Sequence, residues 1–297
     1  MEDRLRSLPG WLRELGAARR FGTTDRRGTL NLVDDAARSR AAHLVRTGRT
    51  ISLARPLRGG ESITTAERPG FAHETSYVEH GGGIGAGLDH VVLDPHGLMN
   101  THLDALNHVA VDGNYYAGPV ESPDQGSIEV LLPEGVVTRA VYVNACGDGQ
   151  AWVERPVAGD DIAARLDAAG VELLPGDALC LDMGRDRYES AHGRMLPSPA
   201  TEDDPGGGLS SDGARWIAEH DVAILAWDML DSREAHVTRA SAHLLTWAIG
   251  LLLVDNCEFA ALRMALGATT QVAGALVLAP LVVPGANGVN LNPLVLC

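Results

Sequence analysis

Short apolar runs separated by helix-like segments are the feature that most limits the folds open to this chain. The runs cover residues 136–146, 178–183, 222–227, 251–254 and 272–283. Their length suits buried strands, and none reaches the length of a membrane span. Helical segments are expected between several of them, over residues 160–169, 210–217 and 243–250. Strands and helices that alternate without a linker or an internal repeat predict a single α/β domain over residues 1–297.

The first half of the chain is less regular. An amphipathic stretch at residues 11–15 indicates a short helix, or part of an N-terminal arm of about residues 1–33 that packs on a partner subunit. Asp34 and Asp35 can cap a helix that runs through Leu44, and residues 50–57 have the pattern of a strand. Residues 58–88 are expected to form a mobile loop or a subunit arm. Residues 185–208 are expected to form a second long loop.

Charge and composition exclude several classes of function. The 297 residues carry a formal net charge of −15, which repels phosphate backbones, so nucleic acid is not an expected partner. The chain contains no lysine, which excludes a lysine Schiff base and the lysine of a phosphate-binding loop. Its 4 cysteines are widely spaced, so neither a disulfide framework nor a thiolate zinc site is expected. The charged N-terminus lacks the features of a secretory signal, and we expect a cytoplasmic protein with no membrane partner.

The segment from Thr101 to His108 concentrates the residue types of a metal site. His102 and Asp104 are two positions apart, so on an extended backbone their side chains point to the same side. Imidazole nitrogen and carboxylate oxygen are ordinary ligands of Zn²⁺ and Mn²⁺. His108 is near enough in sequence to act as an acid or base beside the metal. The apolar residues 109–111 predict a strand that fixes its backbone.

Histidine is clustered around this segment. Of the 11 histidines, six fall between positions 73 and 108. Buried apolar strands do not need histidine, whereas metal and proton-transfer sites do. For any single histidine, the better interpretation is a partly buried polar loop in which the imidazole satisfies a backbone group. For His102, Asp104 and His108 together, a functional site is the better interpretation.

The same segment resembles the central motif of the metal-dependent cyclase family, which includes bacterial kynurenine formamidase and isatin hydrolase. The family motif reads His-x-Gly-Thr-His-x-Asp-x-Pro-x-His, and it is matched here by Thr101, His102, Asp104 and His108. The resemblance extends over nearly the whole chain. Residues 20–22 with 28–31 are similar to an N-terminal signature of the family's longer members. The segments 243–255 and 290–294 are similar to its later His…Glu and Asn-Pro segments.

The resemblance implies a fold, a site and an assembly. The expected fold is α/β, with a mixed β-sheet or flattened β-barrel flanked by helices. His102 and Asp104 would bind a divalent metal, Zn or Mn, and His108 would be the catalytic base or acid. His243 and Asp255 would supply a second metal-facing pair. Members of the family usually form dimers or tetramers, so a homodimer or homotetramer is expected.

Several positions depart from the family motif. Leu98 stands where the first histidine is expected and cannot bind metal. Asn100 replaces glycine, Leu106 replaces proline, and Asp255 replaces glutamate. His96, two residues before Leu98, can substitute for the missing ligand if the loop bulges. The alternative for His96 is an ordinary turn histidine.

Three functions follow from these residues, in order of preference. The first is a metal-dependent hydrolase of a small-molecule amide, formamide or lactone, with metal-activated water and a histidine general base. The second is a cyclase or dehydratase that acts on a natural-product intermediate at the same site. The third is a metal-poor binding relative without catalysis, which Leu98 suggests. In the enzymes, Tyr115 and Tyr116 are expected to bind the small-molecule substrate near the mouth of the site.

Overall fold

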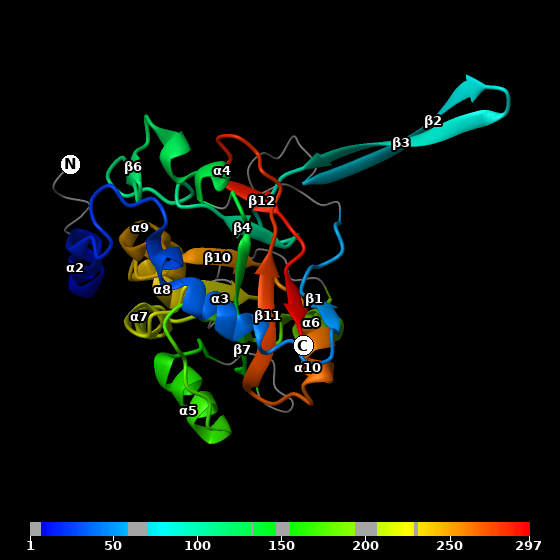
Figure 1. The fold of residues 1–297 in the computed structure, drawn as a ribbon. Helices are drawn as coiled ribbons and strands as arrows, with labels where there is room; N and C mark the ends of the chain where they lie inside the picture. The colour runs from blue at the N-terminus through cyan, green and yellow to red at the C-terminus, as the bar shows by residue number, and fades with distance from the viewer. Residues whose placement is uncertain (1–6, 59–69, 132, 147–154, 194–206, 229–230) are drawn as a thin grey trace.

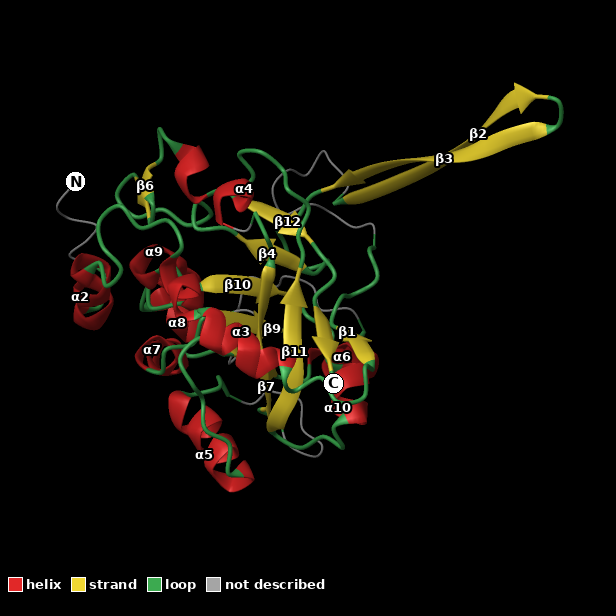
Figure 2. Cartoon of the chain, in the orientation of Figure 1, coloured by secondary structure: helices red, strands yellow, loops and turns green. Residues whose placement is uncertain are grey.

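A curled, mixed β-sheet forms the centre of the molecule (Figure 1 and Figure 2). The computed structural model describes residues 7–58, 70–131, 133–146, 155–193, 207–228 and 231–297. In spatial order the sheet contains β1 (Thr50–Ser52), β13 (Leu294–Leu296), β11 (Gln271–Leu278), β7 (Val136–Asn144), β8 (Ala178–Asp182), β9 (Ile224–Trp227), β10 (Leu252–Asp255), β4 (His102–Asp104) and β12 (Gly288–Asn290). The four strands from β7 to β10 are parallel, and the strands on either side of them pair antiparallel. The sheet therefore joins both halves of the chain, and the expected α/β fold with a mixed sheet is confirmed.

Alternating side chains of the parallel strands enter two different hydrophobic cores. Tyr142 and Cys180 point to one face, whereas Val143 and Leu181 point to the other. Because both faces of the sheet are covered, these strands have apolar residues at nearly every position. This is why the apolar runs in the sequence were continuous and not alternating.

Short helices cover the two faces of the sheet. They are α2 (Gly10–Ala18), α3 (Asp35–Ala42), α4 (Ile128–Leu131), α5 (Gly159–Ala169), α6 (Arg185–His192), α7 (Ser211–Glu219), α8 (Arg233–Val237), α9 (Ala242–Ile249) and α10 (Ala260–Ala265), with 3₁₀ turns η1 (Gly28–Leu32) and η2 (Pro123–Gly126). Asp34 accepts a hydrogen bond from the backbone N–H group of Ala37, so the helix cap expected there is confirmed. Ser210 caps α7 in the same way, through the backbone N–H group of Gly213. No helix in the described part of the chain combines the length and apolar character that crossing a membrane requires.

Two expected strands are shorter in the structure, and one expected loop is partly a helix. The strand expected over residues 50–57 ends at Ser52, and the strand expected over 272–283 ends at Leu278. Residues 185–192 form helix α6 instead of a loop, while residues 194–206 of that expected loop lie outside the described residues. The buried carboxylate of Asp228 accepts hydrogen bonds from the backbone N–H groups of Met183 and Arg185, at 2.8 and 2.9 Å. This long-range partner stabilises the start of α6, and no local sequence pattern shows it.

Most of the expected glycine-rich loop is a long β-hairpin. Strands β2 (Phe71–Gly81) and β3 (Ile84–Leu93) pair antiparallel and project away from the body of the molecule (Figure 1). The prediction of a loop was therefore wrong for residues 71–88. Residues 59–69 of the same expected loop lie outside the described residues. The alternative, a subunit arm, stays a prediction. A second, very small hairpin joins β5 (Asn114–Tyr115) to β6 (Gly118–Pro119).

The described part of the N-terminal segment packs on its own chain. Leu12 of α2 is fully buried, and Gly16 lies so close to Trp247 of α9 that a Cβ atom there would be 2.6 Å from the indole ring. Gly28 packs directly against the backbone of Gly250 at the end of α9. The N-terminal segment therefore supports α9, the helix that carries His243. Packing of this arm on a partner subunit stays a prediction.

The Gly28–Gly250 contact yields a stability prediction. Gly28 has φ +53°, and a Cβ atom there would lie 2.2 Å from the carbonyl oxygen of Gly250. Because both strain and a backbone clash oppose a side chain, Gly28→Ala should lower the free energy of unfolding by about 2 kcal/mol or more in urea denaturation. Gly22→Ala is the matched control, since Gly22 has φ +97° with no atom within 4 Å. It should cost about 1 kcal/mol. Equal losses in the two variants would contradict the proposed clash.

Candidate metal centre

The short strand β4 places His102 and Asp104 on one side of the sheet. Leu103, between them, is fully buried in the hydrophobic core. His102 Nε2 lies 3.6 Å from Asp104 Oδ1, so the two side chains do share one side of the strand. In the antiparallel pairing of β4 with β10, Asp255 lies directly opposite His102. The sheet register therefore adds a second carboxylate from a distant part of the sequence.

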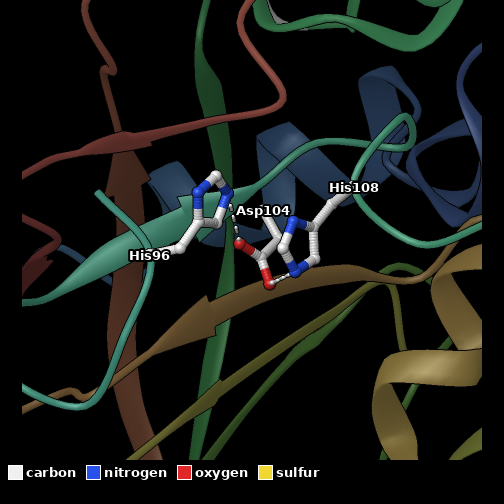
Figure 3. Close-up of side chains that lie close together, drawn as sticks. All are labelled: His96, Asp104 and His108. Carbon is white, nitrogen blue, oxygen red and sulfur yellow. Dashed lines mark ion pairs between the residues drawn. The ribbon is translucent and has the colours of Figure 1, made fainter. Parts of the chain in front are cut away.

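Three further histidines surround the Asp104 carboxylate. Figure 3 shows His96 and His108 on either side of it. His96 Nε2 lies 3.5 Å from Oδ1, His108 Nε2 lies 3.6 Å from Oδ2, and His243 Nε2 lies 4.0 Å from Oδ2. The bend that follows β3 brings His96 to the cluster, while the side chain of Leu98 is buried. The structure thus brings together the five residues that the sequence predicted as metal-facing, as well as His108; their role as ligands stays a prediction.

Asp104 is the residue that indicates a metal. Its side chain is fully buried, and neither carboxylate oxygen has a hydrogen-bond partner among the residues that the structure describes. Burial raises the pKa of Asp104 to about 7, with the nearby Asp255 adding to the effect and the His102 and His243 imidazoles opposing it. A buried carboxylate without partners is costly, and an ion or another charged group normally compensates it.

The distances in the cluster fit a divalent cation. Two ligands bound tetrahedrally at about 2.1 Å from Zn²⁺ would be about 3.4 Å apart, close to the separations between Asp104 and the imidazoles. Two sets of three residues have ligand atoms within 4.8 Å of one another, and Asp104 belongs to both. The sets are His102, Asp104 and Asp255, and His96, Asp104 and His108. The residues present can therefore hold one divalent metal ion, or two that share Asp104.

His243 is held by carboxylates at both ring nitrogens. Its Nδ1 lies 2.5 Å from Asp231 Oδ2, and its Nε2 lies 3.1 Å from Asp255 Oδ2. Burial lowers the pKa of His243, but Asp255 and Asp231 outweigh this and raise it well above its usual value. Burial likewise opposes ionisation of Asp255, yet His243 lowers the pKa of that carboxyl to about 2. In the absence of metal, His243 and Asp255 form a buried ion pair.

Residues that the sequence analysis missed orient the predicted ligands. Besides binding Nδ1 of His243, Asp231 accepts the backbone N–H of Ala242 at 2.6 Å. Trp227 Nε1 donates to Asp255 Oδ1 at 2.5 Å. The Nδ1 of His102 lies 3.0 Å from the carbonyl oxygen of Asn100, which leaves Nε2 directed at the carboxylates. No spacing rule links these residues to the motif, because only the folded chain brings them to the ligands.

His108 is fixed by a turn, so the strand predicted for residues 109–111 was wrong. Its backbone N–H donates to the carbonyl oxygen of Ala105 at 3.0 Å, and Val111 makes only an isolated bridge to Asn114. The imidazole stacks on His96 with ring centroids 4.4 Å apart. Burial, together with repulsion from His96 and His243, lowers the pKa of His108 to about 3. The ring is therefore neutral at physiological pH and keeps a nitrogen lone pair.

Tyr116 is engaged with the N-terminal segment. Its hydroxyl donates to Asp25 Oδ2 at 2.8 Å, and the Arg19 guanidinium lies over its ring. Its side chain is buried, whereas that of Tyr115, on β5, is half-buried. These contacts show how Tyr116 braces residues 19–25. Substrate binding by Tyr115 and Tyr116 stays a prediction.

Comparisons with known proteins agree with this architecture. The family described as "Putative cyclase" matches residues 40–232 of the chain. A crystal structure described as a novel cyclase is 21% identical, with a TM-score of 0.77, and the match covers 96% of this chain and 99% of that one. Isatin hydrolase A from Labrenzia aggregata, bound to benzyl benzoate, is 17% identical with a TM-score of 0.61, covering 84% of this chain and 94% of its own. An isatin hydrolase bound to the product analogue thioisatinate is 15% identical with a TM-score of 0.60, covering 87% and 96%.

The chain is a mixed α/β protein with a histidine and aspartate cluster suited to a divalent metal, and it belongs to the cyclase family. The structural likenesses show the shared fold. No curated protein matches the sequence.

The contact between His243 and Asp231 yields a testable prediction. A carboxylate that holds the second nitrogen of a metal-binding histidine fixes the ring and raises its basicity. Asp231→Asn should therefore weaken binding of Zn²⁺ by about 10–100-fold in a chelator-competition titration. Asp35→Asn serves as the control, because Asp35 is exposed on α3 and should leave the affinity unchanged. Unchanged affinity in Asp231→Asn would show that His243 is not a ligand or needs no such support.

Proposed function

We propose that this protein is a metal-dependent hydrolase that cleaves an amide, formamide or lactone bond in a small molecule. The observation that carries the proposal is Asp104, a fully buried carboxylate without hydrogen bonds at the centre of four imidazoles. Such a group is unfavourable in a protein interior unless a cation binds it. Membership of the cyclase family supports the same conclusion.

The proposed ligands are Asp104, His102 and Asp255, with His96 and His243 completing the site. Imidazole nitrogen suits Zn²⁺ and carboxylate oxygen suits Mn²⁺, so this mixed set without thiolate is compatible with either ion. When bound, such an ion lowers the pKa of a water molecule and polarises a carbonyl group. His96 supplies the imidazole that the family motif has at position 98, which argues against the metal-poor binding relative suggested by Leu98.

His108 is the proposed general base. Its side chain is 26% exposed, slightly more than those of the other histidines at this site, and its backbone is held by the turn at Ala105. Because its ring is neutral, it can take a proton from the attacking water and return it to the leaving group. Metal binding by its Nε2 is the competing role, since His108 also belongs to one of the two sets of potential ligands.

An apolar cavity of about 430 Å³ reaches His243 and is the proposed substrate site. Its walls come from residues 109–112, directly after His108, and from residues 235–244. Val109, Val111 and Leu244 line it, with Arg239 among its polar residues. This volume and lining are typical of a site for a small, largely apolar molecule. An apolar wall would also limit the entry of bulk water beside the reacting bond.

Cyclisation or dehydration at the same site is the second candidate, favoured by the family's description. The two reactions differ in whether water is gained or lost. The metal-loaded protein should therefore be incubated in H₂¹⁸O with a panel of amides, formamides and lactones, isatin included. Products that contain ¹⁸O support hydrolysis, and products lighter than the substrate by one water support the second candidate. No turnover with either Zn²⁺ or Mn²⁺ would contradict both.

Removal of the central carboxylate tests the metal site. Asp104→Ala should lose bound metal and activity together, because Asp104 belongs to both potential ligand sets. Metal content after gel filtration is measured by atomic emission, and turnover is measured on the same sample. Asp35→Ala, on the surface of α3, is the control and should keep both. A variant of Asp104 that keeps full metal content would exclude it as a required ligand.

Replacement of His108 separates the base from a ligand. His108→Ala should lower turnover by about 10²–10⁴-fold, the usual contribution of a positioned general base. Its metal content should stay near wild type, in contrast to Asp104→Ala. Near-normal turnover would exclude His108 as the base, and loss of metal would make it a ligand instead.

A further inference from the structure

The bend between β3 and β4 is held by two side chains from distant segments. Asn256 Nδ2 donates to the carbonyl oxygens of Gly97 and Asn100, at 2.6 and 3.1 Å. Arg185 Nη2 donates to the carbonyl oxygen of Leu98, which lies between them in the sequence. Backbone carbonyl groups that are removed from water need such partners. Two side chains therefore satisfy three carbonyl groups of one short bend.

Arg185 and Asn256 form one connected unit. Both residues are buried, with 1% and 0% of their surface exposed. Arg185 Nη1 donates to Asn256 Oδ1 at 2.6 Å, and Arg185 Nε donates to Glu189 Oε1 at 2.8 Å, one turn further along α6. The guanidinium group presents its donors in a rigid planar fork. It can therefore hold several acceptors in fixed directions at the same time.

Both residues of this unit come from the same edge of the sheet. Arg185 begins α6, shortly after β8, and Asn256 follows the last residue of β10. Strands β8 and β10 each run parallel to β9, so their carboxyl ends lie at one edge. Asp255, a predicted metal ligand, is the last residue of β10. Thr101 Oγ1, just after the bend, donates to the carbonyl oxygen of Asn256 at 2.7 Å. The bend is thereby fixed to the edge of the sheet that carries the candidate metal centre.

The path of the bend decides which side chain faces Asp104. Leu98 stands where the family motif has a histidine, and it is buried. The imidazole of His96 lies beside the carboxylate instead, with Nε2 at 3.5 Å from Asp104 Oδ1 (Figure 3). Between the two, Gly97 has φ +125°, a conformation that residues with a side chain rarely adopt. The chain can keep this path only if the carbonyl groups along it are held.

We propose that Arg185 and Asn256 are positioning residues that hold His96 at the metal site, a role that rests on the proposed function. The competing role for Arg185 is a buried charge that only stabilises the fold. A guanidinium group is costly to bury and is poorly suited to filling space alone. Of the four acceptors of its side chain, only Glu189 is charged. Its other donors are used to fix neutral groups, two of which are Leu98 and Asn256.

The test is the affinity of the full chain for Zn²⁺ in a chelator-competition titration. Arg185→Met should weaken binding by about tenfold or more, because a ligand that loses its supporting contacts is no longer held in position. Arg139→Met is the matched control. Arg139 likewise donates to a carboxylate and a backbone carbonyl, those of Asp177 and Glu172, but beside the amino end of β8. It should leave the affinity unchanged, even where it lowers the stability of the fold.

A double-mutant cycle separates positioning from general destabilisation. His96→Ala should itself weaken binding, and Arg185→Met should have little further effect in that background, because it acts through His96. Equal losses from Arg185→Met with and without His96 would overturn the proposal, and so would an unchanged affinity in His96→Ala.

A second variant avoids removing the buried charge. Asn256 has φ +56°, which glycine adopts without strain. Asn256→Gly therefore removes the two hydrogen bonds to the bend and should also weaken Zn²⁺ binding by about tenfold or more. Far-ultraviolet circular dichroism of each variant shows that the fold is kept.

Asp104→Ala, titrated alongside, distinguishes this inference from the proposed function. Binding that depends on Asp104 but is unchanged in both Arg185→Met and Asn256→Gly would overturn the positioning role alone. A wild type that binds neither Zn²⁺ nor Mn²⁺ would overturn the proposed metal site, and the positioning role with it.

Discussion

The burial of the Asp104 carboxylate is the constraint on which the rest of the site depends. Both oxygens are removed from water and receive no hydrogen bond from the described part of the chain. Solvation of an ionised carboxylate is lost on burial, and only a nearby positive charge recovers a comparable free energy. Four imidazoles surround Asp104 with their nitrogens at 3.5–4.0 Å, too far for hydrogen bonds and suitably placed around a cation. A bound cation would compensate the burial of this carboxylate.

A scaffold of ordinary interactions holds this unfavourable group in place. β4 is fixed on both sides by β10 and β12, so its two polar side chains have little freedom to move away from each other. Behind them, Asp231 and Trp227 orient His243 and Asp255 through charge-assisted hydrogen bonds. The N-terminal segment braces α9 at Gly28, which fixes the helix that carries His243. Rigid support of this kind would keep the predicted ligands in position for a metal.

Much of the architecture could be predicted from local sequence. Apolar runs predicted the central strands, and the cap at Asp34 predicted the start of α3, because burial and capping leave local patterns. Helix α6 and the β2–β3 hairpin were not predicted. The first depends on hydrogen bonds to Asp228, 43 residues away from Arg185. The second has glycines that suggested a loop, and its strand character shows only in the pairing of β2 with β3.

Sequence alone determined that His102 and Asp104 share one side of a strand, because side chains alternate with a period of two along any extended backbone. It also placed His96 and His108 close to them along the chain. Only the tertiary structure decided that the His96 imidazole lies beside the Asp104 carboxylate, since this depends on how the bend after β3 packs against the chain that leads into β12. Asp255 lies at the site because β10 pairs with β4 in a register that sets it opposite His102. Asp231 lies there because it accepts a hydrogen bond from Ala242 at the start of α9. Both contacts join distant segments of the chain. Local spacing fixes the direction of a side chain, whereas packing of the whole chain fixes what that side chain meets.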